Sequence, residues 1–132
     1  MKILVIEDDF VSRCVFIEYL SPYGSCDAAA NGKEGVMAFK LAFESGKPYD
    51  LVCLDIMMPE MDGQEVLKQI RQYEEEKGIG GLAGVKIIMT TALDDFKNIM
   101  TAFRHQCEAY LVKPIEKAKL VAQMKTMGLV QG

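Results

Sequence analysis

The sequence contains a single histidine, His105, and no tryptophan. One histidine excludes a histidine-rich metal site and leaves no spare base for a serine–histidine–aspartate triad. The four cysteines lie far apart, and no two of them have the C-x-x-C spacing of a redox or zinc motif. We therefore expect them to be small, buried apolar side chains rather than disulfides or metal ligands. They are Cys14, Cys26, Cys53 and Cys107.

Long apolar runs and an excess of basic residues are also missing. No run approaches the roughly 20 apolar residues that cross a bilayer. The apolar segment after Met1 meets Glu7 too early for a signal peptide, so we expect a cytoplasmic protein. The net charge of −4 and the pI near 5.0 argue against a nucleic-acid-binding surface, which needs clustered lysine and arginine.

What is present is the alternating pattern of an α/β domain. The 132 residues are half hydrophobic, which fits one compact domain with a substantial core. Runs of strand length alternate with segments in which apolar residues recur at helical spacing. We predict strands at residues 2–6, 26–30, 49–54, 85–90 and 109–112, and helices that begin near Val11, Asn31, Asp62, Asp94 and Ile115.

The strand segments predict a parallel sheet with helices on both faces. Strands that are buried on both faces are nearly continuous apolar runs, and ILVI, LVCL, KIIM and AYLV have this composition. Alternation of strands and helices along the chain is typical of doubly wound folds with right-handed crossovers. Ligands of such folds bind beyond the carboxyl ends of the strands. The residues that directly follow the strands are therefore the candidates for function.

These candidates are acids, one hydroxyl and one amine. Close carboxylates repel one another by roughly 4 kcal/mol per pair at an effective dielectric constant of 20, and a cation would relieve that repulsion. Carboxylate oxygens suit Mg²⁺, which also binds phosphate oxygens. The combination predicts a pocket for a phosphoryl group, in which a carboxylate can form an acyl phosphate. The candidates are Glu7, Asp8, Asp9, Asp55, Thr91 and Lys113.

Four segments resemble the receiver domain of bacterial two-component response regulators. They read ILVIEDD, LVCLDIMMPEMDG, IIMTTA and AYLVKP, in this order. The resemblance extends from Met1 to about Met127 and is strongest to the stand-alone, chemotaxis-type (CheY-like) members. It implies a flavodoxin-like, doubly wound, five-stranded parallel sheet with five helices. The strand order 2-1-3-4-5 is likewise implied by the family and does not follow from the spacing of the segments. We expect residues 1–132 to be a single receiver domain with no effector domain.

The resemblance also implies a role for each site residue. Asp55 matches the phosphoacceptor, which takes a phosphoryl group from a phosphohistidine. Asp8 should bind Mg²⁺ directly, Glu7 through a water molecule, and Met57 through its backbone carbonyl. Asp9 lies one position beyond the acidic pair and is expected to be a surface acid, although the register stays open at this point.

The remaining positions concern the switch. Thr91 matches the hydroxyl that bonds a phosphoryl oxygen, with Thr90 as the competing position, and the following Ala92 favours Thr91. Tyr110 matches an aromatic residue that changes rotamer on activation, but a half-buried packing role is an equal alternative. Lys113 matches the phosphoryl-binding lysine, and the peptide bond to Pro114 is often cis in the family.

These assignments predict a phosphorylation-dependent switch in a phosphorelay rather than a turnover enzyme, although the domain would catalyse its own phosphorylation and dephosphorylation. The expected partners are a sensor histidine kinase or phosphotransfer protein and a downstream protein that binds the face of the fourth helix (94–105), fifth strand and fifth helix. Nucleic acid and membrane are not expected partners. Alternatives are a receiver domain cut from a longer regulator, an inert receiver-like scaffold, a flavin-binding module, and an aspartyl-phosphate phosphatase. The phosphatase would require an acid where Met57 stands.

Overall fold

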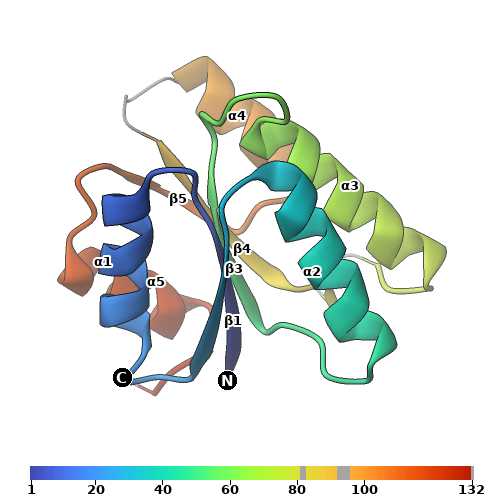
Figure 1. The fold of residues 1–132 in the computed structure, drawn as a ribbon, viewed down its shortest axis with the longest axis horizontal. Coiled ribbons are helices and arrows are strands. Elements are labelled where there is room, and N and C mark those ends of the chain that lie inside the picture. Colours follow the sequence, from blue (N-terminus) through green and yellow to red (C-terminus); the bar gives the residue numbers. More distant parts are fainter. Residues whose placement is uncertain (81–82, 92–95, 132) are drawn as a thin grey trace.

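The computed structural model describes residues 1–80, 83–91 and 96–131, and of residues 96–99 the backbone alone. Within these residues, ten elements alternate in the predicted order (Figure 1). They are β1 (Lys2–Ile6), α1 (Phe10–Leu20), β2 (Ser25–Ala29), α2 (Gly32–Glu44), β3 (Leu51–Asp55), α3 (Gly63–Glu76), β4 (Lys86–Thr91), α4 (Phe96–Arg104), β5 (Ala109–Val112) and α5 (Lys117–Thr126).

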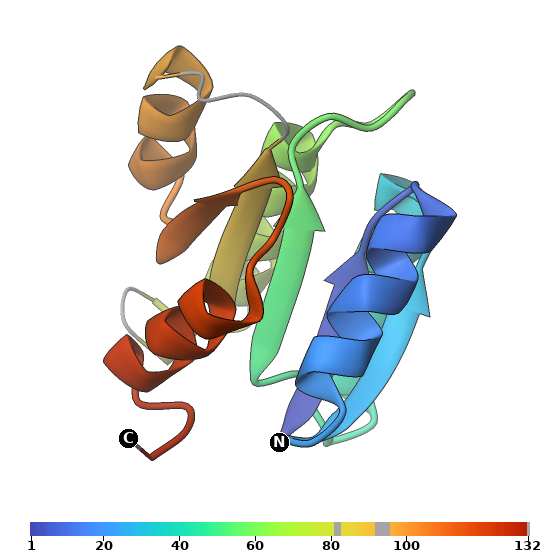
Figure 2. The same cartoon turned by 90° about the vertical axis from the view of Figure 1, so that its left-hand side faces the viewer.

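The strands form one parallel sheet of order β2-β1-β3-β4-β5, which confirms the predicted flavodoxin-like topology. Helices α1 and α5 cover one face, and α2 and α3 cover the other (Figures 1 and 2). In the part of the chain that the structure describes, no helix is long and apolar enough to cross a membrane.

Successive residues of each central strand enter different halves of the core. Ile3 and Val5 pack with Phe16 and Leu20 of α1, whereas Leu4 and Ile6 face the α2 side. All four strand residues are fully buried. A strand buried on both faces cannot show alternation of apolar and polar residues, which is why a continuous apolar run predicted it correctly.

Two predicted strand ends shift by one residue toward the carboxyl end. The third strand ends at Asp55, not at Leu54, because Asp55 pairs with Thr90 in the sheet. The fourth strand ends at Thr91, which pairs with Val112. Both polar residues are therefore held by strand pairing instead of by a loop. Asp94, where the fourth helix was predicted to begin, and Ala92 lie outside the described residues.

The helices predicted to begin near Asn31 and Asp62 are each capped by that residue. The Asn31 side chain accepts a hydrogen bond from the Glu34 N–H at 2.8 Å, and Asp62 accepts one from the Glu65 N–H at 3.0 Å. Such caps satisfy backbone donors that the first helical turn leaves unpaired. They fix the start of α2 and of α3, the two helices that lie together on one face of the sheet.

An ionic network joins α3 to the far end of the sheet from the predicted site. The Arg71 guanidinium donates hydrogen bonds to Glu74 at 2.7 Å, to Glu108 at 2.9 Å, and to the Gln106 carbonyl at 2.7 and 3.0 Å. Glu74 is 5% exposed and also accepts the Val85 N–H at 2.7 Å. The network thus fixes the start of β4 and of β5 against α3.

Replacement of the central cation should destabilise the fold strongly. Arg71→Met leaves two carboxylates without their counterion, and we expect the free energy of unfolding to fall by about 3 kcal/mol in urea denaturation. Lys119→Met is the matched control, because Lys119 and Glu116 form an exposed pair at 3.7 Å. Its effect should stay within about 0.5 kcal/mol. Equal losses in the two variants would contradict a dominant role for the Arg71 network.

Candidate functional site

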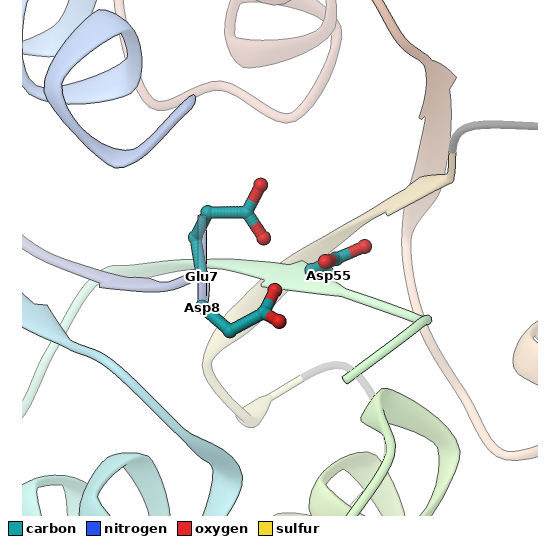
Figure 3. Close-up of side chains that lie close together, drawn as sticks. All are labelled: Glu7, Asp8 and Asp55. Carbon is teal, nitrogen blue, oxygen red and sulfur yellow. The ribbon is translucent and has the colours of Figure 1, made fainter. Parts of the chain in front are cut away.

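Three carboxylates converge beyond the carboxyl ends of β1 and β3. Glu7 and Asp8 follow β1, and Asp55 ends the adjacent β3 (Figure 3). One oxygen from each of the three lies within 4.8 Å of the others. Glu7 and Asp55 are buried at 1% and 4% exposure, and Asp8 is exposed. These three carboxylates, of which Asp8 is open to solvent, could hold a metal ion.

Asp9 lies outside this cluster and caps helix α1. Its side chain accepts a hydrogen bond from the Ser12 N–H at 2.9 Å and forms the N-cap of α1. This hydrogen bond lowers the pKa of Asp9 below its usual value. The sequence left open which two of the three acids belong to the cluster. In the structure they are Glu7 and Asp8, and Asp9 caps the helix.

Lys113 supplies the positive charge of the site. Its ammonium group donates a hydrogen bond to Glu7 Oε1 and lies 3.4 Å from Asp55 Oδ2. Burial lowers the pKa of Lys113, but the hydrogen bond to Glu7 and the charge of Asp55 outweigh burial and raise it above its usual value. Lys113 is therefore charged at neutral pH. The Lys113–Pro114 peptide bond is cis, as the resemblance suggested.

The ion pair with Lys113 provides a hydrogen bond to only one of the two carboxylate oxygens of Glu7. Among the residues that the structure describes, its second oxygen, Oε2, is buried and has no hydrogen-bond partner. An unpaired buried carboxylate oxygen is costly, and a cation or a metal-bound water is the kind of group that satisfies it. The pairing of Glu7 with Lys113 was not anticipated from sequence, which assigned Glu7 to the metal alone.

The environment of Asp55 opposes its ionisation. Burial, followed by a hydrogen bond with Glu7 and the charge of Glu7, raises the pKa of Asp55 to about 7, although Lys113 and the Met57 N–H act in the opposite direction. The Met57 N–H lies 3.3 Å from Asp55 Oδ1, and the Met57 side chain is 65% exposed beside the site. A cation bound here would favour the ionised, nucleophilic form of Asp55.

Thr91 and Tyr110 lie on the α4 side of the sheet. Thr91 is two residues after Met89, which packs in the same half of the core as Tyr110, so Thr91 shares that face and Thr90 points to the other. Thr91 is 3% exposed, and its carbonyl accepts the Lys113 N–H at 2.6 Å. Because side chains alternate along β4, the Thr91 side chain faces the same side of the sheet as Tyr110, and that of Thr90 does not.

Tyr110 has the packing role that the sequence left open. It is half-buried against the core, and its ring meets that of Phe103 edge to face at 5.9 Å between centroids. This contact couples β5 to α4 in the structure. A change of Tyr110 rotamer on activation stays a prediction.

One residue beside the site, Gly63, was missed by the sequence analysis, which predicted only that a helix begins near Asp62. A Cβ atom at Gly63 would collide with the backbone of Asp55 and Ile56, and the Gly63 N–H donates to the Ile56 carbonyl at 2.9 Å. The start of α3 therefore lies directly against the end of β3. A glycine right after an N-cap, in the segment that follows Asp55, was the available signal.

Comparison with known proteins gives a family. Residues 3–125 match the model of the response regulator receiver domain. A probable C4-dicarboxylate response regulator, DctR, of Halalkalibacterium halodurans is 35% identical over 127 residues, which cover 94% of this chain and 50% of that protein. Hybrid signal transduction histidine kinase L of Dictyostelium discoideum is 30% identical and is covered over 7% of its length. The chain spans about half the length of the response regulators that it matches.

Solved structures of receiver domains have the same fold as this chain. The receiver domain of histidine kinase CKI1 from Arabidopsis thaliana, complexed with Mg²⁺ and BeF₃⁻, is 25% identical with a TM-score of 0.80, over 96% of this chain and 89% of that one. The receiver domain of Ssk1, in a co-crystal with the histidine phosphotransfer protein Ypd1 of Saccharomyces cerevisiae, is 26% identical with a TM-score of 0.83, over 99% and 90%.

The raised pKa of Asp55 predicts a pH-dependent stability. Because the folded protein holds this proton more tightly than the unfolded chain, the stabilisation is complete below the unfolded pKa of about 3.9 and is lost as the pH rises toward about 7. In metal-free buffer, Asp55→Asn should therefore gain about 1–3 kcal/mol over the wild type between pH 4 and pH 8, measured by urea denaturation.

Glu18→Gln, which removes an exposed carboxylate from α1, is the control for the change of charge. It should not reproduce the gain at pH 8. A stability difference between Asp55→Asn and wild type that is the same at both pH values would show that Asp55 is not destabilised by ionisation.

Proposed function

This chain belongs to the response regulator receiver domain family, and on that basis we propose that it is a phosphorylation-dependent signalling switch with Asp55 as its phosphoacceptor. The observation that carries the proposal is the group of Glu7, Asp8 and Asp55 within 4.8 Å, with the Lys113 ammonium 3.4 Å from Asp55. Acids at this density together with one lysine suit the transfer of a dianionic phosphoryl group.

The donor set fits Mg²⁺. Asp8 and Asp55 would bind the ion directly and the Met57 carbonyl would complete the protein ligands, while Glu7 would act through a water molecule. The buried, unpartnered Oε2 of Glu7 supports this assignment, because it offers an acceptor for such a water. When bound, Mg²⁺ neutralises charge between the acceptor carboxylate and the incoming phosphoryl group.

In the proposed reaction, an oxygen of Asp55 attacks the phosphorus of a phosphohistidine. The new P–O bond gives an acyl phosphate, and the P–N bond breaks with its electron pair returning to the imidazole of the donor. Lys113 then exchanges Glu7 for a phosphoryl oxygen, since its ammonium already lies close to Asp55. The Thr91 hydroxyl donates a hydrogen bond to another phosphoryl oxygen.

The same bonds would drive the switch. Movement of Thr91 toward the phosphoryl group changes the α4 side of the sheet, where Tyr110 contacts Phe103. A shift from 1% to 99% of the active form requires about 5.5 kcal/mol of differential binding. Several charge-assisted hydrogen bonds to one phosphoryl group can supply it.

The proposed partners are a phosphohistidine donor and a downstream protein. The Ssk1 receiver domain, 26% identical, has been crystallised with the phosphotransfer protein Ypd1, which supports a donor of that kind. Phe10, at 67% exposure, and Met57, at 65%, offer apolar contacts beside the site. Met100, Phe103 and Val112 are 40–43% exposed and support an output surface on α4 and β5.

We further propose that the domain is cytoplasmic and that it is a switch rather than a turnover enzyme, since hydrolysis of the phosphoryl group only resets Asp55. Whether it acts alone or as one domain of a longer regulator decides how the signal leaves it. A direct output through protein contacts is the stand-alone case.

Phosphorylation can be tested by intact mass. Incubation with acetyl phosphate and Mg²⁺ should add one phosphoryl group to the wild type and none to Asp55→Asn, and removal of Mg²⁺ with EDTA should abolish the adduct. Because the chain has no tryptophan to report metal binding by fluorescence, mass is the suitable readout.

Two results would contradict the proposal. An adduct that persists in Asp55→Asn would place the acceptor elsewhere. Absence of any adduct, together with no beryllofluoride binding in ¹⁹F NMR, would show that the site no longer accepts phosphate. Beryllofluoride binding without an adduct would instead indicate rapid hydrolysis at a working site.

A further inference from the structure

One backbone carbonyl of the proposed phosphoryl site is bonded to a side chain instead of to a neighbouring strand. Arg13, in the first turn of α1, donates a hydrogen bond from Nη1 to the Glu7 carbonyl at 2.8 Å. Glu7 directly follows β1, and its own N–H donates to the Ala29 carbonyl of β2 at 3.1 Å. Backbone carbonyls that leave water need such a partner. Arg13 therefore supplies the hydrogen bond at the point where strand pairing ends.

This carbonyl belongs to the peptide unit between Glu7 and Asp8. Because a peptide unit is planar, a hydrogen bond to its oxygen also fixes the direction of the Asp8 N–H and Cα. The Glu7 side of the unit is already held by the hydrogen bond to β2. The Arg13 contact thus sets the direction in which the backbone presents Asp8.

Asp8 depends on its backbone more than the other two acids of the cluster do. Glu7 is held by the hydrogen bond from Lys113. Asp55 is fixed by strand pairing and by the Met57 N–H. Over the described part of the chain, the exposed Asp8 side chain forms no hydrogen bond and no ion pair. Figure 3 nevertheless shows it directed toward Asp55, so its position comes from the backbone.

The Arg13 side chain is itself held in place. Its guanidinium carbon lies 5.5 Å from the centre of the Phe10 ring, in cation–π contact. The Arg13 N–H donates to the carbonyl of Asp9, the N-cap of the helix, at 2.9 Å. A planar guanidinium that stacks on one face keeps the N–H groups at its edge free to point at a carbonyl. Phe10 therefore holds the guanidinium that positions Asp8.

Arg13 also carries a positive charge, which by itself would oppose a metal ion in this site. If the charge were its only effect, removal of Arg13 would strengthen Mg²⁺ binding. A contact that positions a metal ligand acts in the other direction, because its loss leaves the ligand free to turn away from the ion. The sign of the change in Mg²⁺ affinity thus separates the two roles.

We propose that Arg13 is a positioning residue that orders the Glu7–Asp8 peptide unit for Mg²⁺ binding, and that Phe10 acts on the metal site through Arg13. The proposal rests on the proposed function, in which Asp8 is a ligand of Mg²⁺. Because Phe10 is 67% exposed, a protein that packs against it would also change the order of the metal site.

The first test uses the metal-free protein labelled with ¹⁵N. Arg13→Met removes the hydrogen bond and the charge but keeps an unbranched side chain. The NMR order parameter of the Asp8 amide should fall from the rigid value of about 0.85 to about 0.6 or below, whereas the amides within β1 should stay rigid. An Asp8 amide that stays rigid in Arg13→Met would overturn the proposal.

The second test is a titration with Mg²⁺, followed by amide chemical shifts. Arg13→Met should raise the dissociation constant for Mg²⁺ about tenfold, as the loss of a group that orients a metal ligand does. Arg104→Met is the matched control, because it removes the same charge from an exposed position on α4. It should change the constant by less than about twofold. Unchanged or tighter Mg²⁺ binding in Arg13→Met would exclude a positioning role.

Phe10→Leu tests the ring contact while every hydrogen bond of the site stays in place. It should weaken Mg²⁺ binding about threefold in the otherwise native chain, through loss of the cation–π contact. In the Arg13→Met background it should have no further effect. Equal effects in the two backgrounds would show that Phe10 does not act through Arg13.

Phosphorylation by acetyl phosphate separates this proposal from the proposed function. At saturating Mg²⁺, Arg13→Met should form the acyl phosphate within about threefold of the wild-type rate, because the residues around the phosphorus are unchanged. A wild type that binds Mg²⁺ but accepts no phosphoryl group would contradict the proposed function and leave the Arg13 result in force. A wild type that does not bind Mg²⁺ would overturn both.

Discussion

The structure depends on how one buried carboxylate is tolerated at the mouth of a parallel sheet. Asp55 ends a strand without a single exposed residue, and the carboxylate of Glu7 lies beside it. Only the Lys113 ammonium balances the two charges within the described site. The resting site is therefore neutralised by an internal cation, and a metal ion bound as proposed would share its carboxylate partners. Resting stability and reactivity come from the same three side chains.

The sheet and the location of the site could be predicted, because both follow from how parallel strands are buried and connected. Strands that are apolar throughout gave the parallel sheet, and the topology then placed Asp8, Asp55 and Lys113 at one end. The strand ends were less accurate, since Asp55 and Thr91 belong to strands by pairing with neighbours far away in sequence. Side-chain pairing such as Lys113 with Glu7 depends on rotamers in a crowded site, and no local pattern encodes it.

The two ends of the sheet carry different groups of polar residues. At the amino ends of β4 and β5, the Arg71 network fixes helix, strand and loop through hydrogen bonds. At the carboxyl ends, Thr91 lies beside the proposed phosphoryl site, and Tyr110 packs on the same face of the sheet.

The position of β5 has a consequence for synthesis. The acidic residues follow β1 and end β3, but the lysine that balances them follows β5, at the edge of the sheet. On the ribosome, Asp55 is thus made well before its counterion Lys113. An incomplete chain carries the acids without the cation and cannot assemble the pocket. The proposed phosphoryl site is therefore completed only once Lys113 has been made and β5 has joined the sheet.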